Sequence, residues 1–197
     1  MPRSLPPTLP TILALAFVAG CAAPPAPAPA VAAAPALPGK VIWTDGHGDL
    51  AVAAAGAATC PTTSTAEVSA ALARTNAVRR EAGLAPLTAN PVLQRVAEKH
   101  ACDMARRGLM THAGTTTTGP LARAKQEGYR PRVISENIAA GAPGRFTLSG
   151  TLEQWALSPK HRANITIAQM QDFGIGHAVA ADGKATFWTA VYATTGR

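Results

Sequence analysis

The chain has 197 residues, enough for one well-cored domain but too few for two once the first sixty residues are set aside. Its formal net charge of +7 falls to +6 without the N-terminal segment that carries Arg3, because 17 basic groups then face 11 acidic ones. The basic residues are scattered and have no interleaved aromatic residues, which argues against a nucleic-acid-binding module. They favour a solvated surface or a weak attraction to anionic lipid or cell-wall polymers.

The N-terminus has the layout of a secretory signal. Arg3 is followed by the apolar run "TILALAFVAG", which is too short to span a bilayer as a mature helix, and then by Cys21. "VAGC" resembles the bacterial lipobox, in which the cysteine is lipidated and becomes the new N-terminus. We predict a signal over 1–20 and a lipid anchor at Cys21, with an ordinary cleaved signal as the alternative. Ala22, in place of an Asp, favours the outer membrane facing the periplasm.

The next two segments are poor in structural signals. Residues 21–40 are rich in Pro and Ala and carry almost no charge, so they predict an extended tether. Residues 41–65 are dominated by Gly and Ala and stay unassigned. Asp45-Gly46 could form a short hairpin there, with His47 in its loop.

Four helices are predicted from apolar periodicity and end signals. The first covers 66–82, with Val68, Ala71, Leu72, Thr75 and Val78 on its apolar face and Arg79 off it. The second starts at Asn90-Pro91 and ends at Gly108. Two shorter helices follow, in "GPLARAKQEGY" and in "TLSGTLEQWALS", the latter limited by Pro159.

The end of the chain changes to the two-residue period of strands. "DFGIGHAVA" and "ATFWTAVYA" flank Asp182-Gly183, a hairpin signal, and "RVISENIAAG" reads as a third strand. One face of the first strand carries only Gly174, Gly176 and Ala178, so another element, most simply a helix, must approach it closely. The order of elements predicts an α+β layered domain over 66–195.

The cysteines suggest one crosslink. If Cys21 carries lipid, Cys60 and Cys102 remain as a pair in an oxidising compartment, and we expect a disulfide between them. Two separate buried thiols are the alternative.

Seven blocks of the sequence together resemble one known family. They are "NAVRREAGLAPL", "LQRVAEKHACDMA", "MTHAG", "SENIAAG", "WALSPKHRANI", "GIGHAV" and "ATFWTAVY". In this order and spacing they resemble the CAP superfamily (cysteine-rich secretory proteins, antigen 5 and pathogenesis-related class 1 proteins), and most of all its small SCP-like bacterial branch. The resemblance covers 68–193 and implies a three-layer α-β-α sandwich with a central antiparallel sheet.

The resemblance also implies a cavity. In the family, two histidines and two glutamates line a solvent-open cavity that often holds a divalent cation. The matching residues are His112, Glu136 and His161, and the second glutamate is replaced by Ser158. Glu153, two residues before Trp155, is expected to point to another side of its helix and to lie at the surface.

The chemistry of this set is ambiguous. Neutral imidazoles bind zinc or similar ions, and Glu136 could be a third ligand or a base toward metal-bound water. Alternatively, His112, Glu136 and His161 hydrogen-bond one another and brace loops, with Asn137 tying down local backbone. We expect His100 to be a partly exposed packing residue and His177 to be structural.

Three functions fit the sequence. The first is a non-catalytic envelope module, monomeric and without nucleic-acid partners, that binds a small amphiphile, a glycan or an envelope protein. The second is a metal-dependent hydrolase of peptide or cell-wall bonds with Glu136 as its base. The third is a structural envelope protein without a ligand. Because the second carboxylate is missing, binding is favoured over turnover.

Overall fold

The computed structural model describes residues 1, 41–44, 46 and 48–195. The predicted signal and tether, Cys21, Asp45 and His47 therefore lie outside the described residues. The described part contains five helices and seven strands. Their bounds are β1 Val41–Thr44, β2 Leu50–Ala51, α1 Thr65–Glu81, β3 Thr88–Ala89, α2 Pro91–Arg107, β4 Leu109–Met110, α3 Pro120–Gln126, β5 Val133–Gly141, α4 Leu148–Leu157, α5 Pro159–Ile165, β6 Asp172–Val179 and β7 Thr186–Thr194.

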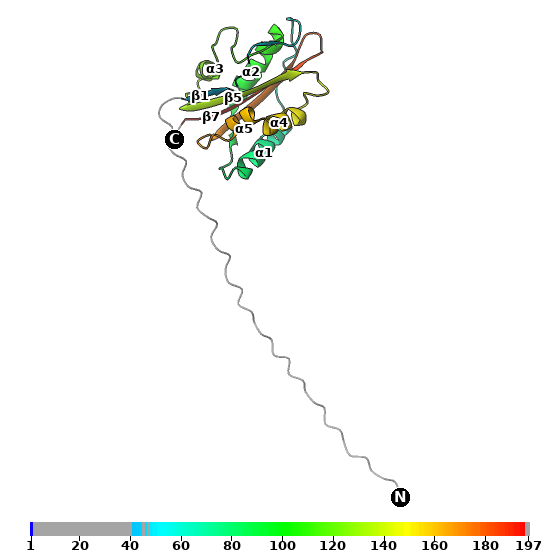
Figure 1. The fold of residues 1–197 in the computed structure, drawn as a ribbon, viewed down its shortest axis with the longest axis vertical. Coiled ribbons are helices and arrows are strands. Elements are labelled where there is room, and N and C mark those ends of the chain that lie inside the picture. The colour runs from blue at the N-terminus through cyan, green and yellow to red at the C-terminus, as the bar shows by residue number, and fades with distance from the viewer. Residues whose placement is uncertain (2–40, 45, 47, 196–197) are drawn as a thin grey trace. The chain divides into compact units, whose positions relative to one another are not determined.

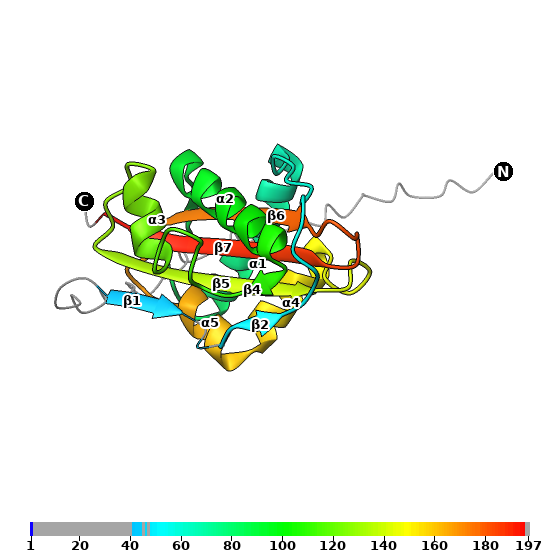
Figure 2. The same cartoon turned by 90° about the horizontal axis from the view of Figure 1, so that it is seen from above.

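The central sheet has the strand order β1-β5-β7-β6-β3, and β1, β5 and β7 lie side by side in Figure 1. Its three inner strands are antiparallel, and the edge strands β1 and β3 each pair in parallel with their neighbours. The helices α2 and α3 lie on one face, and α4 and α5 lie on the other (Figure 2). Buried side chains of α1 and α4 share one core cluster, so α1 belongs to the second layer. The predicted α+β three-layer sandwich is confirmed, with parallel edges added to its antiparallel centre.

Residues 41–65, unassigned from sequence, contribute two short strands. β1 pairs with β5 in register from Val41 opposite Val133 to Thr44 opposite Glu136. β2 pairs with β4 instead. The two strands therefore serve different sheets and do not form the hairpin that Asp45-Gly46 suggested.

The predicted helix ends are formed by the expected residues. The Asn90 side chain accepts hydrogen bonds from the backbone N–H groups of Val92 and Leu93, and Pro91 occupies the first turn of α2. Gly108 ends α2 with φ 66°, a left-handed conformation that favours glycine. α5 was not predicted, since Pro159 was interpreted only as a stop. It occupies the first position of a new helix instead.

α2 packs against the face of β6 that carries Gly174 and Gly176. A Cβ on Gly174 would lie 2.2 Å from the carbonyl carbon of Leu93, and one on Gly176 would lie 2.4 Å from the Cα of Glu98. Such contacts are far inside van der Waals distance, so only glycine allows the helix backbone to rest on this strand. The close approach expected from the sequence is confirmed.

Arg79 departs from the prediction. It was placed off the apolar face of the first helix, yet it is fully buried. Its guanidinium donates hydrogen bonds to five backbone carbonyl groups, those of Ala85, Ile165, Ile167, Ala168 and Met170. Because these acceptors satisfy all the donors of the buried cation, Arg79 fixes the connection between α5 and β6.

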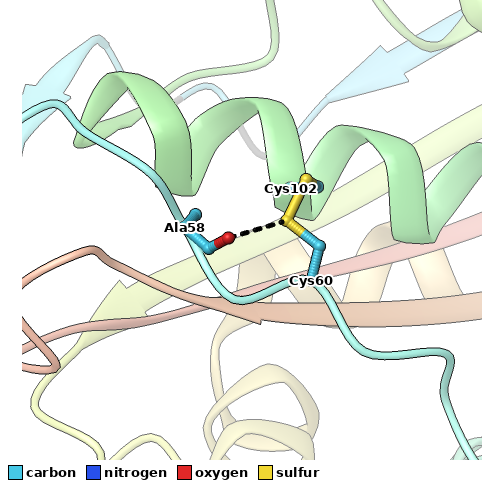
Figure 3. Close-up of a disulfide and its surroundings, with 3 residues drawn as sticks. All are labelled: Ala58, Cys60 and Cys102. Carbon is cyan, nitrogen blue, oxygen red and sulfur yellow. Dashed lines mark hydrogen bonds between the residues drawn. A yellow bond between two sulfur atoms is a disulfide. The ribbon is translucent and has the colours of Figure 1, made fainter.

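The disulfide between Cys60 and Cys102 is present, with Cα atoms 5.4 Å apart (Figure 3). It ties the segment before α1 to the middle of α2, as expected, and the alternative of two separate thiols is wrong. The same segment is also held by backbone hydrogen bonds from Val52 to Gly108 and from Gly56 to Arg106. None of the described helices combines the length and the hydropathy needed to cross a membrane.

Candidate functional site

Glu136 lies in the middle of β5 and is fully buried. Side chains alternate along a strand, so Glu136 shares a face with Ile134 and Ile138. Those two residues pack in the core clusters beneath α2. The carboxylate therefore points into the layer of α2 and α3, where an unpaired charge would be costly.

Arg123 of α3 supplies the counter-charge. Its Nη2 atom lies 2.7 Å from Oε1 and 2.6 Å from Oε2 of Glu136, so both carboxylate oxygens accept from the guanidinium. Arg123 itself is 7% exposed. Arg123 is not among the site residues predicted from the sequence. The available signal was its place on the buried stripe of α3 with Pro120 and Ala124.

His112 joins the same carboxylate. Its Nδ1 lies 2.9 Å from Oε1 of Glu136. An ionised carboxylate only accepts hydrogen bonds, so Nδ1 carries the proton. Arg123 also donates from Nη1 to the carbonyl oxygen of His112, at 2.8 Å. The ion pair thus fixes both the backbone and the ring of His112.

His100 is the fourth member, and the expectation of a partly exposed packing residue is wrong. It is fully buried, and its Nε2 lies 2.9 Å from the carbonyl oxygen of Thr111 and 3.7 Å from Oε1 of Glu136. A carbonyl oxygen only accepts, so Nε2 carries the proton. The signal was its position on the apolar stripe of α2, between Val96 and Met104.

The charges of this cluster follow from burial and pairing. Burial alone would raise the pKa of the Glu136 carboxyl, but Arg123, and after it His100 and His112, hold that pKa down at about 2. Burial lowers the pKa of His100 to about 4, against an opposing pull from Glu136. At neutral pH the cluster therefore holds one ionised carboxylate, one guanidinium and a neutral His100.

These shifts predict acid sensitivity that begins well above the carboxyl range. His100 has a lower pKa when folded, about 4 in place of 6.5, so protons favour the unfolded chain as pH falls through this window. The expected loss of unfolding free energy between pH 7 and pH 4 is on the order of 3 kcal/mol. Glu136 adds a further loss below about pH 4.5, because its folded pKa is about 2.

Urea denaturation at several pH values measures this loss. In His100→Gln, which keeps a donor toward Thr111, the slope between pH 6.5 and 4 should largely disappear. His177→Gln on β6 is the matched control and should keep the slope. An unchanged slope in His100→Gln would contradict the assignment.

His161 belongs to a second network, on the other face of the sheet. Its Nδ1 lies 2.8 Å from the Ser158 hydroxyl, and its carbonyl oxygen accepts from Nδ2 of Asn137 at 3.1 Å. Asn137 follows Glu136 on β5, so their side chains point to opposite faces. Asn164 of α5 extends this network. Its Nδ2 donates to the backbone carbonyl oxygen of Glu136 and to the side-chain Oδ1 of Asn137.

A pocket of about 330 Å³ opens beside His112. We call it the His112 pocket. Its wall includes Thr44, His112, Pro120, Leu121, Ala122 and Lys125. It therefore combines apolar surface from α3 with one cationic side chain.

Comparison with known proteins identifies the family. The sequence model of the cysteine-rich secretory protein family, CAP, matches residues 72–192. The chain belongs to this family. YkwD of Bacillus subtilis (strain 168) is 30% identical over 103 residues, which make up 52% of this chain and 39% of YkwD. The chain thus spans about two-fifths of the length of that curated relative.

Solved structures share the CAP fold. An outer surface protein of Borrelia burgdorferi matches with a TM-score of 0.58 and 17% identity, over 67% of this chain and 95% of that protein. An extracellular protein of Bacillus anthracis str. Ames that contains an SCP domain matches with a TM-score of 0.56 and 24% identity, over 65% of this chain and 40% of that protein. These likenesses concern the fold, and the two proteins are an outer surface and an extracellular protein.

Ser158, Glu153 and His177 contact residues other than Glu136. Ser158, at the position of the family's second glutamate, contacts His161 as described above. Glu153 is exposed and pairs with Arg74 of α1 at 2.9 Å, so it lies away from Glu136. His177 stacks on Trp188, with ring centroids 4.7 Å apart.

Glu136 is a poor metal ligand in this arrangement. Both of its oxygens accept from Arg123, so a cation bound to Glu136 would lie beside the guanidinium and be repelled by its positive charge. Among the described residues, no three His, Cys, Asp or Glu side chains are grouped so that they could hold a metal ion. The set of His112, Glu136 and His161 therefore does not fit a three-ligand zinc site.

Proposed function

We propose that this protein is an exported, lipid-anchored CAP-domain protein of the bacterial envelope that binds a small ligand without turning it over. The observation that carries this proposal is that both carboxylate oxygens of Glu136 accept hydrogen bonds from Arg123. The carboxylate that a hydrolase would use as its base is occupied, buried and held ionised. It serves as a brace for His112.

A hydrolytic role is the second candidate. One observation favours it: Glu136 orients the His112 ring with its proton on Nδ1, as a carboxylate does for a catalytic histidine. Against it stands the pKa of about 2 for Glu136, since an efficient general base has a pKa near the working pH. In addition, Ser158 stands at the position of the family's second glutamate, so the second carboxylate of the family's cavity is missing there.

The His112 pocket suits a small amphiphile with an anionic head. Pro120, Leu121 and Ala122 offer apolar contact, and Lys125 at the same wall offers a positive charge. Most ligand pockets are concave and largely apolar, with a few polar groups that fix orientation. A divalent cation, if one binds, would be held by histidine and water and would exchange readily.

Calorimetry on the full chain tests the proposal, with octanoate as the amphiphile and zinc chloride as the cation. We expect saturable octanoate binding that Lys125→Gln weakens about tenfold, whereas Lys160→Gln on α5 leaves it unchanged. Zinc should bind weakly and equally well in Glu136→Gln.

A panel of peptides and muropeptides provides the catalytic arm. Turnover that is lost in Glu136→Gln would overturn the binding proposal in favour of the hydrolase. Absence of both octanoate binding and turnover would leave the purely structural envelope role.

The location rests on the predicted lipidation of Cys21. Cys21→Ala should move the protein from the membrane fraction to the soluble fraction of fractionated cells. Ala22→Asp is the matched variant, which should stay membrane-bound but move to the inner membrane. Retention of Cys21→Ala in the membrane would contradict the anchor.

A further inference from the structure

A second pocket, separate from the His112 pocket, lies beside the disulfide. Its volume is about 430 Å³. Its wall contains both cysteines of the bridge, together with Pro61, Thr62, Glu98, Lys99 and Arg106. We call it the disulfide pocket.

The two cysteines of the bridge differ in their exposure. Cys60 is exposed, whereas Cys102 is only 8% exposed. Cys102 belongs to α2, and Cys60 belongs to the segment that runs beside this helix (Figure 3). A disulfide is exchanged when a thiolate attacks one of its two sulfur atoms. A thiolate that enters the pocket from solvent therefore reaches Cys60 first, and Cys102 becomes the leaving group.

Positive charges flank the leaving group. Lys99 lies three residues before Cys102 on α2 and Arg106 lies four residues after it, so both share the helix face of the cysteine. Arg106 is exposed and has no hydrogen-bond or ion-pair partner among the described residues. Lys99 pairs with Glu127 at 2.5 Å, but the same carboxylate also faces Arg95. Nearby cations stabilise a thiolate and attract an anion.

The segment around Cys60 is held on both sides of the cysteine. Glu98, the carboxylate of the pocket, accepts from the backbone N–H of Thr63 at 2.8 Å. Thr59 exchanges two backbone hydrogen bonds with β6, each of 2.9 Å. These contacts do not depend on the bridge, so they keep Cys60 close to Cys102 when the bridge opens. An opened bridge can therefore close again.

We propose that the Cys60–Cys102 bridge is a reversible modification site for small anionic thiols. The thiolate attacks Sγ of Cys60 and forms a new disulfide with it, while the bond to Cys102 breaks and its electron pair leaves with Cys102 as a thiolate. The sulfur of the thiol is oxidised as that of Cys102 is reduced, so the step needs no other oxidant or reductant. Attack by Cys102 on the new disulfide restores the bridge and releases the thiol.

Three small thiols of different charge test the proposal: anionic 3-mercaptopropionate, neutral 2-mercaptoethanol and cationic cysteamine. The full chain carries Cys21→Ala, so that Cys60 and Cys102 are its only cysteines. Excess N-ethylmaleimide stops the reaction and caps the released cysteine, and peptide mass spectrometry locates both products. Each rate is divided by the rate of the same thiol with 2-hydroxyethyl disulfide, which removes differences in intrinsic reactivity.

At low ionic strength, we expect the normalised rate of 3-mercaptopropionate to exceed that of cysteamine about tenfold. The thiol should be found on Cys60 and the maleimide on Cys102. Arg106→Gln should reduce the ratio of the two rates about threefold. Arg80→Gln is the matched control, because Arg80 is exposed near the far end of α1, and it should leave the ratio unchanged.

Two results would overturn the proposal. Equal normalised rates for the three thiols, or reaction only where urea unfolds the chain, would leave a purely structural bridge. A thiol found on Cys102 would contradict the assignment of Cys60 as the attacked residue. The disulfide pocket and the His112 pocket share no residue, so failure of this proposal is distinguishable from failure of octanoate binding.

Discussion

Arg123→Met is expected to lower the unfolding free energy by about 3–5 kcal/mol. The change leaves the Glu136 carboxylate fully buried without its counter-charge. Burial then dominates, so the pKa of Glu136 should rise. The variant should therefore lose less stability than the unmodified chain when pH falls from 7 to 5. Urea denaturation at the two pH values measures both effects.

A double variant separates the net contribution of the ion pair to the unfolding free energy from the destabilisation caused by removing only one partner. Arg123→Met combined with Glu136→Leu removes both charges and should recover most of the lost stability, as replacement of buried pairs by apolar side chains often does. Arg74→Met is the matched control, because the Arg74–Glu153 pair has side chains 32% and 53% exposed and should contribute less than about 1 kcal/mol. A loss in Arg123→Met as small as in this control would contradict the central place of the ion pair.

Removal of the disulfide by Cys60→Ala with Cys102→Ala is the second large effect. The bridge closes a loop with a sequence separation of 42, which in the chain-entropy model corresponds to about 4 kcal/mol of stabilisation. Guanidinium denaturation should show this loss, and a reducing agent should produce a similar loss in the unmodified chain.

The double alanine variant also serves as the control for the reducing agent, which should not destabilise it further. If the unmodified chain keeps its stability when its thiols are shown to be reduced, the backbone hydrogen bonds from Val52 and Gly56 hold this segment by themselves. The entropic account of the bridge would then be wrong.

The parts of the fold that depend on neighbouring residues were predictable. The ends of α2 follow from Asn90, Pro91 and Gly108, and the β6–β7 hairpin follows from Asp182-Gly183. The contact of α2 with β6 was also predictable, because Gly174 and Gly176 leave one face of β6 without a large side chain. α5 was missed because the same proline that ends one helix can begin the next.

The candidate site was only partly predictable, because its contacts join distant elements. The pairing of Arg123 with Glu136 links α3 to β5, and no local spacing rule connects them. His100 was misjudged because its side chain is polar, although its spacing places it on the apolar stripe of α2 between Val96 and Met104. Motif resemblance found His112 and Glu136 but could not reveal that a guanidinium holds the carboxylate.

The seating of α2 on β6 also constrains the order of folding. Leu93 rests on Gly174 of β6, which is made about eighty residues later, whereas Cys60 and Cys102 are both made before α3. A chain delivered from its N-terminus can therefore close its crosslink before the surface that buries α2 exists. The apolar face of α2 stays uncovered until the final hairpin arrives, so this interval is when the growing protein is most exposed to aggregation or to a chaperone.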